Sequence, residues 1–266
     1  MRGYGNYTPV LKAEMEPELM RLIHSVAYRV TKADCLDLPE YTDIVRYVEL
    51  EKNAAKTYKD LVKNSYAELK KGEITTTNVL TKMLRLSQLT GGFLRADGSS
   101  KSVPISCSKL DALGDIIDAA QTEGTKVVVM ARFLPEIDAI CKMLTDHNIG
   151  HAVIYGEVKD RQGEVDRFQD DPEVTVFVGQ IQTAALGITL TAASLMVFYS
   201  LDYSMSNYEQ ARARIHRAGQ KNACTYIHIV AKSTIDEKVM KALRDKSELA
   251  KALVEDFKRG VNAFDV

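Results

Sequence analysis

The apolar and polar positions of the chain change rhythm near residue 125. From there on, short runs of β-branched and other apolar residues recur between more polar stretches. Runs of this kind are typical of strands that are buried on both faces, as in parallel sheets. The predicted strands are Lys126–Met130, His151–Tyr155, Val174–Val178, Leu195–Tyr199 and Thr225–Val230.

Helical or loop patterns separate and follow these predicted strands. They cover Leu134–His147, Gly163–Gln169, Thr183–Ala193 and Asn207–Ala218, and a last helix is predicted from Thr234 to about Lys258. Strands that alternate with helices indicate an α/β fold with an open parallel sheet and right-handed crossovers. Because ligands bind beyond the carboxyl ends of such strands, the chemistry is predicted to lie in the loops that follow them. These loops come after Met130, Tyr155, Val178 and Tyr199.

The first 105 residues have a mainly helical pattern. Apolar spacing predicts an amphipathic helix over Met15–Tyr28, and alternation predicts a strand over Ile44–Leu50. Longer helical patterns follow over Glu51–Lys71 and Asn78–Leu89. A turn-rich interval, residues 91–106, is predicted to be exposed.

Four lysines form a basic stripe along the predicted helix Glu51–Lys71. They are Lys52, Lys56, Lys59 and Lys63, at positions i, i+4, i+7 and i+11. A solvated face is one interpretation of this stripe. A contact surface for the phosphates of a nucleic acid is the other.

Composition narrows the possible functions only a little. The chain has 266 residues, which is enough for one large domain or for a domain with a smaller subdomain. The formal net charge is −1, so any nucleic-acid site must be a local patch and not a property of the whole chain. The five histidines are scattered and the four cysteines form no CxxC pair, so neither a metal site nor a disulfide framework is predicted.

The same features predict where the protein resides. The sequence has no apolar run of membrane-spanning length and no signal-peptide core. The widely spaced cysteines fit a reducing compartment. We therefore expect a cytoplasmic protein of bacterial or phage type without a membrane partner.

The basic segment NYEQARARIHRAGQK, Asn207–Lys221, differs from the other helical patterns. On a helix, Gln210, Arg214 and Arg217 would share one face at i, i+4 and i+7. Gly219 would then end the helix at the position where a C′ glycine is typical. Because two arginines one turn apart repel each other, this face is either solvated or completed by a polyanion such as phosphate.

Ordered motifs in this half of the chain match those of a known family. QARARIHRAGQK (Gln210–Lys221) ends in HRxGQ, VGQIQTAALGITLTAA (Val178–Ala193) precedes it, and KVVVMARF (Lys126–Phe133) comes earlier still. These segments resemble motifs VI, V and IV of the Swi/Snf-type DNA-dependent ATPases of helicase superfamily two. Related RNA helicases usually end motif VI in HRxGR, so Gln220 favours the DNA-translocating branch.

Further segments extend the resemblance over nearly the whole chain. Tyr155–Gln169 and Tyr199–Ala211 are similar to the blocks that flank motif V, and Ser233–Ala250 is similar to a helix that braces the two lobes of the motor. Upstream, Leu19–Glu40 resembles the exit from the first lobe, and Val79–Phe93 resembles the helical protrusion that leads into the second.

The resemblance implies a fold class and a domain organisation. The fold is an α/β RecA-like open parallel sheet flanked by helices, the C-terminal lobe of a helicase of the P-loop NTPase type, with an N-terminal mainly helical portion. The implied domains are the helical portion at 1–105, the RecA-like lobe at 106–232 and a brace helix at 233–266.

It also implies roles in ATP hydrolysis. Arg214 and Arg217 would reach a nucleotide as arginine fingers and stabilise the charge of the transition state. Gly187 would let the backbone approach the nucleotide, and Gln210 would orient the arginines or contact the nucleotide. Asp202 would pair with an arginine of the motif VI helix or help to order the cleft.

The resemblance further implies contacts with the DNA backbone in and near motifs IV and V. The residues concerned are Arg132, Arg161, Gln182 and Thr183. Phosphate contacts without base readout suit a translocase that moves along any sequence.

Two departures from the family pattern limit these expectations. Ala184 and Ala185 stand where motif V usually has two glycines, and their methyl groups could weaken a close backbone contact with phosphate. The chain also has neither a GxxxxGK[ST] phosphate loop nor an acidic box after a strand. ATP and Mg²⁺ would therefore be bound jointly with a missing first RecA-like lobe, and the chain alone is not expected to hydrolyse ATP.

Two other classes of protein remain as alternatives. One is a non-catalytic adaptor, derived from a helicase lobe, that binds DNA or protein. The other is an unrelated doubly wound α/β enzyme, which the order of the motifs and the lack of a GxGxxG fingerprint disfavour.

Overall fold

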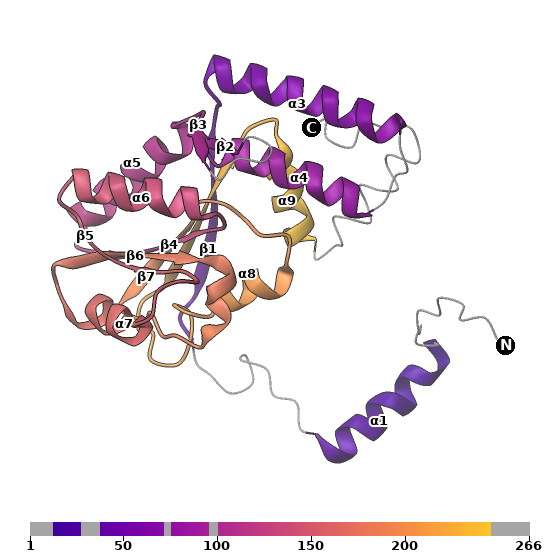
Figure 1. Cartoon of the computed structure of the whole chain (residues 1–266). Helices are drawn as coiled ribbons and strands as arrows, with labels where there is room; N and C mark the ends of the chain where they lie inside the picture. The colour runs from indigo at the N-terminus through magenta and orange to yellow at the C-terminus, as the bar shows by residue number, and fades with distance from the viewer. Residues whose placement is uncertain (1–12, 28–37, 72–75, 96–100, 246–266) are drawn as a thin grey trace. The chain divides into compact units, whose positions relative to one another are not determined.

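The structure, a computed structural model, describes residues 13–27, 38–71, 76–95 and 101–245 (Figure 1). The chain forms two compact units, Met1–Leu38 and Pro39–Val266. In the first unit, a 3₁₀ turn (Ala13–Met15) leads into α1 (Glu16–Val26), which confirms the amphipathic helix expected there. Among the described residues, no helix is both long and apolar enough to cross a membrane.

Six parallel strands form the sheet of the second unit, in the order β1-β8-β7-β4-β6-β5. They are β1 (Tyr41–Val48), β4 (Lys126–Ala131), β5 (Gly150–Ile154), β6 (Val174–Gln180), β7 (Ala193–Phe198) and β8 (Cys224–Ala231). The five strands predicted after residue 125 are all present, with ends shifted by no more than about two residues, the usual error of such boundaries. The predicted α/β fold class, an open parallel sheet flanked by helices, is confirmed.

Helices cover both faces of this sheet. α5 (Ser108–Thr122) and α6 (Leu134–Asp146) pack on the face that includes Val127, Val129 and Val197. The opposite face, which includes Val128 and Phe198, packs against α3 (Lys52–Lys71), α4 (Thr76–Thr90), α7 (Arg161–Asp170), α8 (Met205–Arg212) and α9 (Ile235–Arg244). Because successive residues of a strand point to opposite faces, strands covered on both sides must be apolar throughout, as the sequence pattern required.

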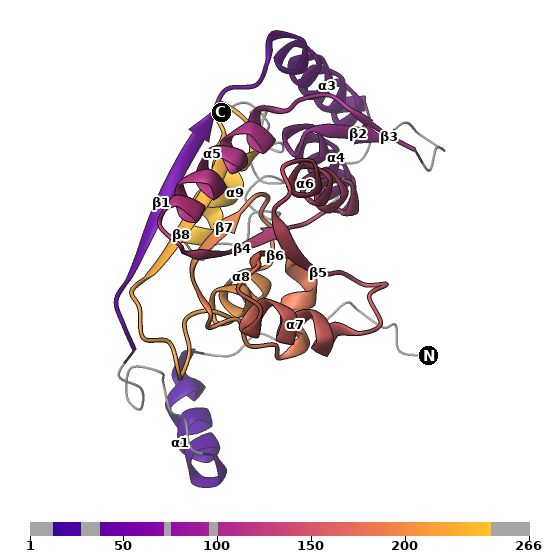
Figure 2. The same ribbon diagram turned by 90° about the vertical axis from the view of Figure 1, so that its left-hand side faces the viewer.

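The strand β1 comes from the portion before residue 105 but joins the sheet of the lobe. It forms the outer edge of the sheet at the left of Figure 2 and pairs with β8 over all eight of its residues. The sheet of the lobe therefore includes a strand from the portion that was expected to be mainly helical. The two compact units divide the chain between Leu38 and Pro39, and the expected domain boundary at 105/106 stays a prediction.

The interval at 91–106 is not simply an exposed loop. β2 (Phe93–Arg95) pairs with β3 (Ser102–Pro104) in an antiparallel hairpin, and Phe93 is buried edge-on against Phe133. The helix α5 that follows was not predicted, although Leu113 and Ile117 form its buried face at helical spacing. In contrast, α3 and α4 confirm the two helices expected before the hairpin, and the four lysines of the basic stripe are exposed on α3.

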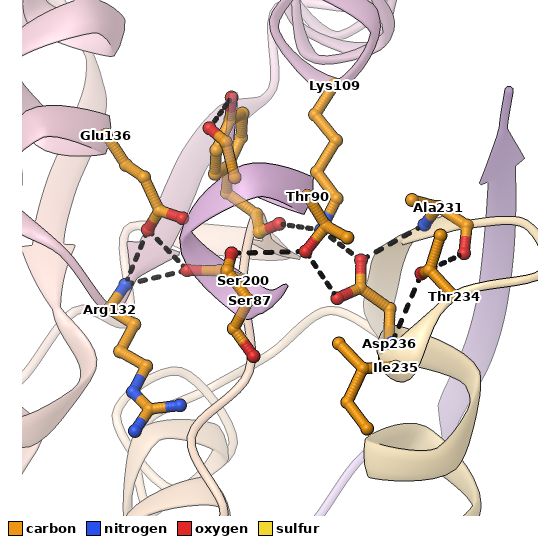
Figure 3. A network of polar contacts seen from close by, with 12 residues as sticks. Ser87, Thr90, Lys109, Arg132, Glu136, Ser200, Ala231, Thr234, Ile235 and Asp236 are labelled. Carbon is orange, nitrogen blue, oxygen red and sulfur yellow. Dashed lines mark hydrogen bonds and ion pairs between the residues drawn. The ribbon is translucent and has the colours of Figure 1, made fainter. Parts of the chain in front are cut away.

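A buried ion pair and its hydrogen bonds connect three helices near the ends of the strands (Figure 3). Lys109 Nζ on α5 lies 2.6 Å from Asp236 Oδ2 on α9 and donates to the Tyr199 carbonyl oxygen at 3.2 Å. Asp236 also accepts hydrogen bonds from Thr90 Oγ1 on α4, at 2.7 Å, and from the Ala231 amide, at 3.1 Å. Since both charges are almost removed from water, their mutual contacts hold α4, α5 and α9 in one arrangement.

Thr234 caps the start of α9. Thr234 Oγ1 accepts from the Asp236 amide, and the Ile235 amide donates to Tyr58 Oη on α3 at 2.7 Å. The helix is described as far as Arg244, and the part of the expected helix beyond residue 245 lies outside the described residues.

Glu136 is a fully buried carboxylate in the first turn of α6 (Figure 3). Its Oε2 accepts from the amides of Arg132 and Phe133, at 3.1 and 3.0 Å, and from Ser200 Oγ at 2.5 Å. Its Oε1 has no hydrogen-bond partner in the described part of the chain, and a Cβ built on Gly91 would come within 2.0 Å of it. Burial raises the pKa of Glu136 to about 7, although the hydrogen bonds from Ser200 and the amides oppose this rise.

Replacing Glu136 by Gln is expected to change how stability depends on pH. The pKa of this carboxyl is raised from an ordinary 4.5 to about 7, so between these values the folded chain binds more protons than the unfolded chain. Its contribution to the free energy of unfolding therefore falls as pH rises through this window, by up to about 3 kcal/mol in total at about 1.4 kcal/mol per pKa unit. A glutamine side chain does not titrate, so the variant loses this fall.

Urea unfolding of both proteins at several values between pH 4.5 and pH 8 measures the effect. Burial lowers the pKa of His228 from 6.5 to about 4, and this residue therefore makes stability rise with pH below 6.5. The informative quantity is the difference between the wild-type and Glu136→Gln curves, because the contribution of His228 cancels in it. Two parallel curves would contradict the prediction.

Candidate functional site

A helix was predicted over Asn207–Ala218, but the observed helix α8 ends at Arg212, before Arg214 and Arg217. α8 is capped by Ser204, whose Oγ accepts from the Asn207 amide, and it ends at Arg212. The prediction that Gln210, Arg214 and Arg217 share one helical face is therefore wrong. Gly219 is also not the glycine that ends α8, although it adopts a positive φ of 98° in the turn that follows.

Tertiary hydrogen bonds hold this segment outside the helix. The Arg214 carbonyl accepts from the Leu190 amide at 2.9 Å, and the Ile215 carbonyl accepts from Gln220 Nε2 at 3.2 Å. The Arg214 amide donates to the Ala211 carbonyl, three residues back, instead of four. The contact with Leu190 in the loop before β7, together with these local hydrogen bonds, favours tight turns over a continued helix.

Arg214 and Arg217 nevertheless lie near each other. Burial lowers the pKa of Arg214, and the positive charge of Arg217 lowers it further. Among the described residues Arg214 Nε is buried without a hydrogen-bond partner, and Arg217 Nη1 donates at 3.3 Å to the Ile188 carbonyl. Within the described ranges neither arginine forms an ion pair with a carboxylate, so two half-buried cations lie together without a counter-charge.

Gln220 connects the arginine segment to the loop before β7. Its Nε2 donates to the carbonyls of Ala193 and Ile215, at 2.8 and 3.2 Å. Its Oε1 accepts from the amides of Lys221 and Asn222, both at 2.9 Å. The sequence identified Gln220 as a mark of the family, but this structural role needs partners that only the fold brings together.

A second cluster lies around the ends of β4 and β6, where it lines a groove of about 310 Å³. The groove is lined by Leu84, Gln88, Phe93, Arg95, Ser102, Arg132, Phe133, Leu134, Pro135, Gln180 and Gln182. Arg132 and Gln182, both candidates from the sequence, therefore share one surface. Gln88 and Gln180 were not candidates, because nothing in their local pattern separates them from ordinary surface glutamines.

Arg132 is held firmly in this groove. Its guanidinium lies 4.0 Å from the centre of the Tyr203 ring, and its Nε lies 3.9 Å from Asp202 Oδ1. Its Nη1 is buried and has no hydrogen-bond partner among the residues described. Figure 3 shows the side chain running away from the Glu136 network, while the backbone amide is fixed by Glu136 and Ser200.

Comparisons with known proteins identify the domain and its fold. Residues 108–219 match the model of the helicase conserved C-terminal domain. The SWI2/SNF2 ATPase core of Sulfolobus solfataricus, solved in complex with dsDNA, superposes with a TM-score of 0.69 at 23% identity and covers 94% of this chain and 56% of that one. Residues 108–219 therefore form a helicase conserved C-terminal domain, and the fold of the chain matches that of a SWI2/SNF2 ATPase core.

Further known proteins are similar to this chain in fold or in sequence. The C-terminal part of the Fun30 ATPase domain superposes with a TM-score of 0.64 at 15% identity, over 84% of this chain and 99% of that one. An uncharacterized ATP-dependent helicase of Mycoplasma genitalium is 31% identical over 90% of this chain, and the helicase SWR1 of Candida glabrata is 25% identical over 89% of it. The chain spans only 23% and 18% of the lengths of these two relatives.

The other nucleotide candidates of this helicase C-terminal domain have local partners. Gly187 follows the 3₁₀ helix η2 (Ile181–Leu186) with a left-handed φ of 74°, which a glycine adopts without strain. Gln210 Nε2 donates to Ser206 Oγ at 3.0 Å on its own helix. Asp202 accepts from Asn207 Nδ2 at 2.6 Å, and its arginine partner is Arg132, so the expected pairing with an arginine of motif VI is wrong.

Two of the DNA candidates also make contacts within their own loops. Arg161 donates from Nε to the Val158 carbonyl at 3.1 Å and from Nη2 to the Gly156 carbonyl at 3.0 Å, which shapes the loop after β5. Thr183 Oγ1 donates to the Gln180 carbonyl at 2.6 Å inside η2. The side chains of residues 184–186, including the two alanines of motif V, lie outside the described part of the structure.

Proposed function

We propose that this domain is the second motor lobe of a DNA-dependent ATPase, and that Arg214 and Arg217 act on ATP bound by another lobe. The observation that carries the proposal is the pair of half-buried guanidinium groups without a carboxylate partner in the described ranges. Two cations held together favour a polyanion, and a guanidinium fork matches phosphate oxygens. The triphosphate of ATP, with its Mg²⁺ held by the other lobe, would complete the site.

The relatives support the same function. The Mycoplasma genitalium protein is named an ATP-dependent helicase, and the Sulfolobus solfataricus core was solved with dsDNA. By analogy with these relatives, we propose ATP as the nucleotide substrate and DNA as the nucleic acid that the protein binds. DNA phosphates would contact Arg132 and Gln182 in the groove, with Arg161 and Thr183 as further contacts, and without base readout.

We also propose that the chain has the domain organisation that the resemblance implies. A helical protrusion precedes the RecA-like lobe, and a brace helix begins at residue 233. Support comes from the contacts of α9, which bonds to Tyr58 on α3 and to Thr90 on α4. The protrusion and the brace are thus fastened to each other and, through Lys109, to the lobe.

Adding the first lobe tests the proposed function. We call the two-lobe protein this chain together with a RecA-like lobe that carries the phosphate loop, joined covalently or mixed. DNA-stimulated ATP hydrolysis is expected from the two-lobe protein and not from this chain alone, because the phosphate loop and the metal carboxylates come from the other lobe. DNA binding without hydrolysis by the two-lobe protein would favour the adaptor alternative.

Replacing Arg132 by Gln is expected to weaken DNA binding of the two-lobe protein by the same factor for every sequence. Loss of one phosphate contact should lower the slope of log K against log salt by about 1. Fluorescence anisotropy with two duplexes of different sequence, at several salt concentrations, measures both effects. Arg167→Gln serves as the control, because Arg167 is exposed on α7 and pairs with Glu164. An unchanged salt slope would remove Arg132 from the proposed interface.

A further inference from the structure

Arg212, the last residue of α8, is bound to the edge strand β1. Its Nη1 and Nη2 donate to Asp43 Oδ1 and Oδ2 at 2.7 and 3.0 Å, a two-pronged ion pair. Nη1 also donates to Tyr208 Oη at 2.8 Å, and the guanidinium lies 4.0 Å from the centre of the Tyr226 ring. The Arg212 side chain is 13% exposed and that of Asp43 is 36% exposed, so the arginine end of this two-pronged pair is shielded from water while the carboxylate end reaches the surface.

The backbone at the end of α8 is fixed at the same place. Tyr226 Oη donates to the Arg212 carbonyl at 3.1 Å. Tyr226 on β8 is the direct register partner of Asp43 on β1. The ion pair and this hydrogen bond therefore tie one residue, the one at which the helix ends, to two neighbouring strands.

A second contact to the same upstream segment follows four residues later. His216 Nε2 lies 2.8 Å from the Pro39 carbonyl oxygen, so this nitrogen donates, and the ring packs edge-on against Tyr41. His216 stands between Arg214 and Arg217 in the sequence. The arginine segment is thus held at Arg212 and at His216 by residues 39–43, where the chain enters the second unit.

We propose that Asp43 and Arg212 are positioning residues for Arg214 and Arg217. Because β1 begins where the chain from the first unit enters the sheet, its register sets the place of the arginine segment. Loss of the contacts at Asp43 and Pro39 would release the arginine segment from this edge of the sheet. This proposal rests on the function proposed above, since it gives the arginines their role at the nucleotide.

Hydrogen exchange in this chain tests the positioning without any activity. Asp43→Asn keeps the shape of the side chain and removes its charge, and Arg212→Lys keeps the charge and removes the fork. In both variants the amides of Ala213, Arg214 and His216, all hydrogen-bonded to the preceding turn, are expected to exchange about tenfold faster. The amides of β4 should not change, and neither should any of these amides in the matched controls Asp146→Asn and Arg167→Lys. Unchanged exchange at residues 213–216 would overturn the proposal.

ATP hydrolysis by the two-lobe protein gives an independent readout. Asp43→Asn is expected to lower kcat by about 10- to 100-fold with little change in the KM for ATP, because small displacements of catalytic groups cost this much. In an Arg217→Ala background, Asp43→Asn should cost little more, since its effect passes through the arginine segment. An equal loss in both backgrounds would identify a general structural role and overturn the positioning role.

The two proposals fail in different ways. If Arg217→Ala hydrolyses ATP as fast as the wild type, the proposed function is wrong, and the positioning role for catalysis falls with it. If Arg217→Ala is inactive and Asp43→Asn is fully active, only the positioning role is wrong.

Discussion

Replacing Arg217 by Ala is expected to lower DNA-stimulated ATP hydrolysis by the two-lobe protein about 10³- to 10⁵-fold, the range found for arginine fingers. Arg217 lies near Arg214 and, within the part of the chain that the structure describes, makes one long hydrogen bond, to the Ile188 carbonyl at 3.3 Å. Its guanidinium is therefore available for a ligand, and the charge that it would stabilise develops only in the transition state. The loss should appear in kcat more than in nucleotide binding.

Three controls make this result interpretable. Arg217→Lys keeps the charge but not the fork, so it should recover only part of the rate. Arg167→Ala removes an exposed arginine on α7 and should leave hydrolysis unchanged. Thermal unfolding should show that Arg217→Ala is folded, because a single weak hydrogen bond contributes only about 1 kcal/mol. A folded Arg217→Ala protein that hydrolyses ATP at the wild-type rate would contradict the role of Arg217 as an arginine finger.

Replacing Lys109 by Met is expected to lower the free energy of unfolding of this chain by about 3–5 kcal/mol. Lys109 is buried, and its ammonium group lies 2.6 Å from Asp236 Oδ2, whose side chain is only 12% exposed. Met fills most of the space of the lysine stem but leaves the carboxylate without its counter-charge. A lone buried charge is more costly than either an intact pair or no pair at all.

Urea unfolding with matched variants measures this cost. Lys142→Met breaks an exposed pair with Asp146 and should cost less than about 1 kcal/mol. The double variant Lys109→Met/Asp236→Asn leaves neither charge of the pair buried. The side-chain oxygen introduced at position 236 can still accept a hydrogen bond from Thr90 or from the Ala231 amide, so the double variant should recover part of the lost free energy of unfolding. If Lys109→Met is as mild as Lys142→Met, the buried pair does not fasten α4 and α9 to the lobe.

Prediction from the sequence succeeded for strands that are buried on both faces, because their residues are apolar at nearly every position. The run Lys126–Met130 is apolar at every position after its first residue because helices cover both faces of β4, and such a run can hardly be anything else. The order of these runs also placed the chemistry at the strand ends, where the structure brings Arg132 and Gln182 into one groove. The roles of these two residues at DNA stay a prediction.

Prediction was wrong where distant partners override local preference. Residues 213–218 have a helical pattern, but hydrogen bonds from Leu190 and Gln220 hold them in turns instead. The glycine-rich interval at 91–106 was expected to be exposed, but Phe93 is buried against Phe133. In both cases a contact comes from a distant part of the chain, Leu190 in the first and Phe133 in the second.

The sequence by itself determined the parallel sheet, the order of its motifs and the presence of two arginines beside a loop at the strand ends. Only the tertiary structure decided how those arginines are held. Arg212 and Asp43 are 169 residues apart, and no window of sequence shows that they form an ion pair. Apolar periodicity records whether a residue is buried, because burial repeats with the geometry of its own element, whereas a polar partner is chosen by the path of the whole chain.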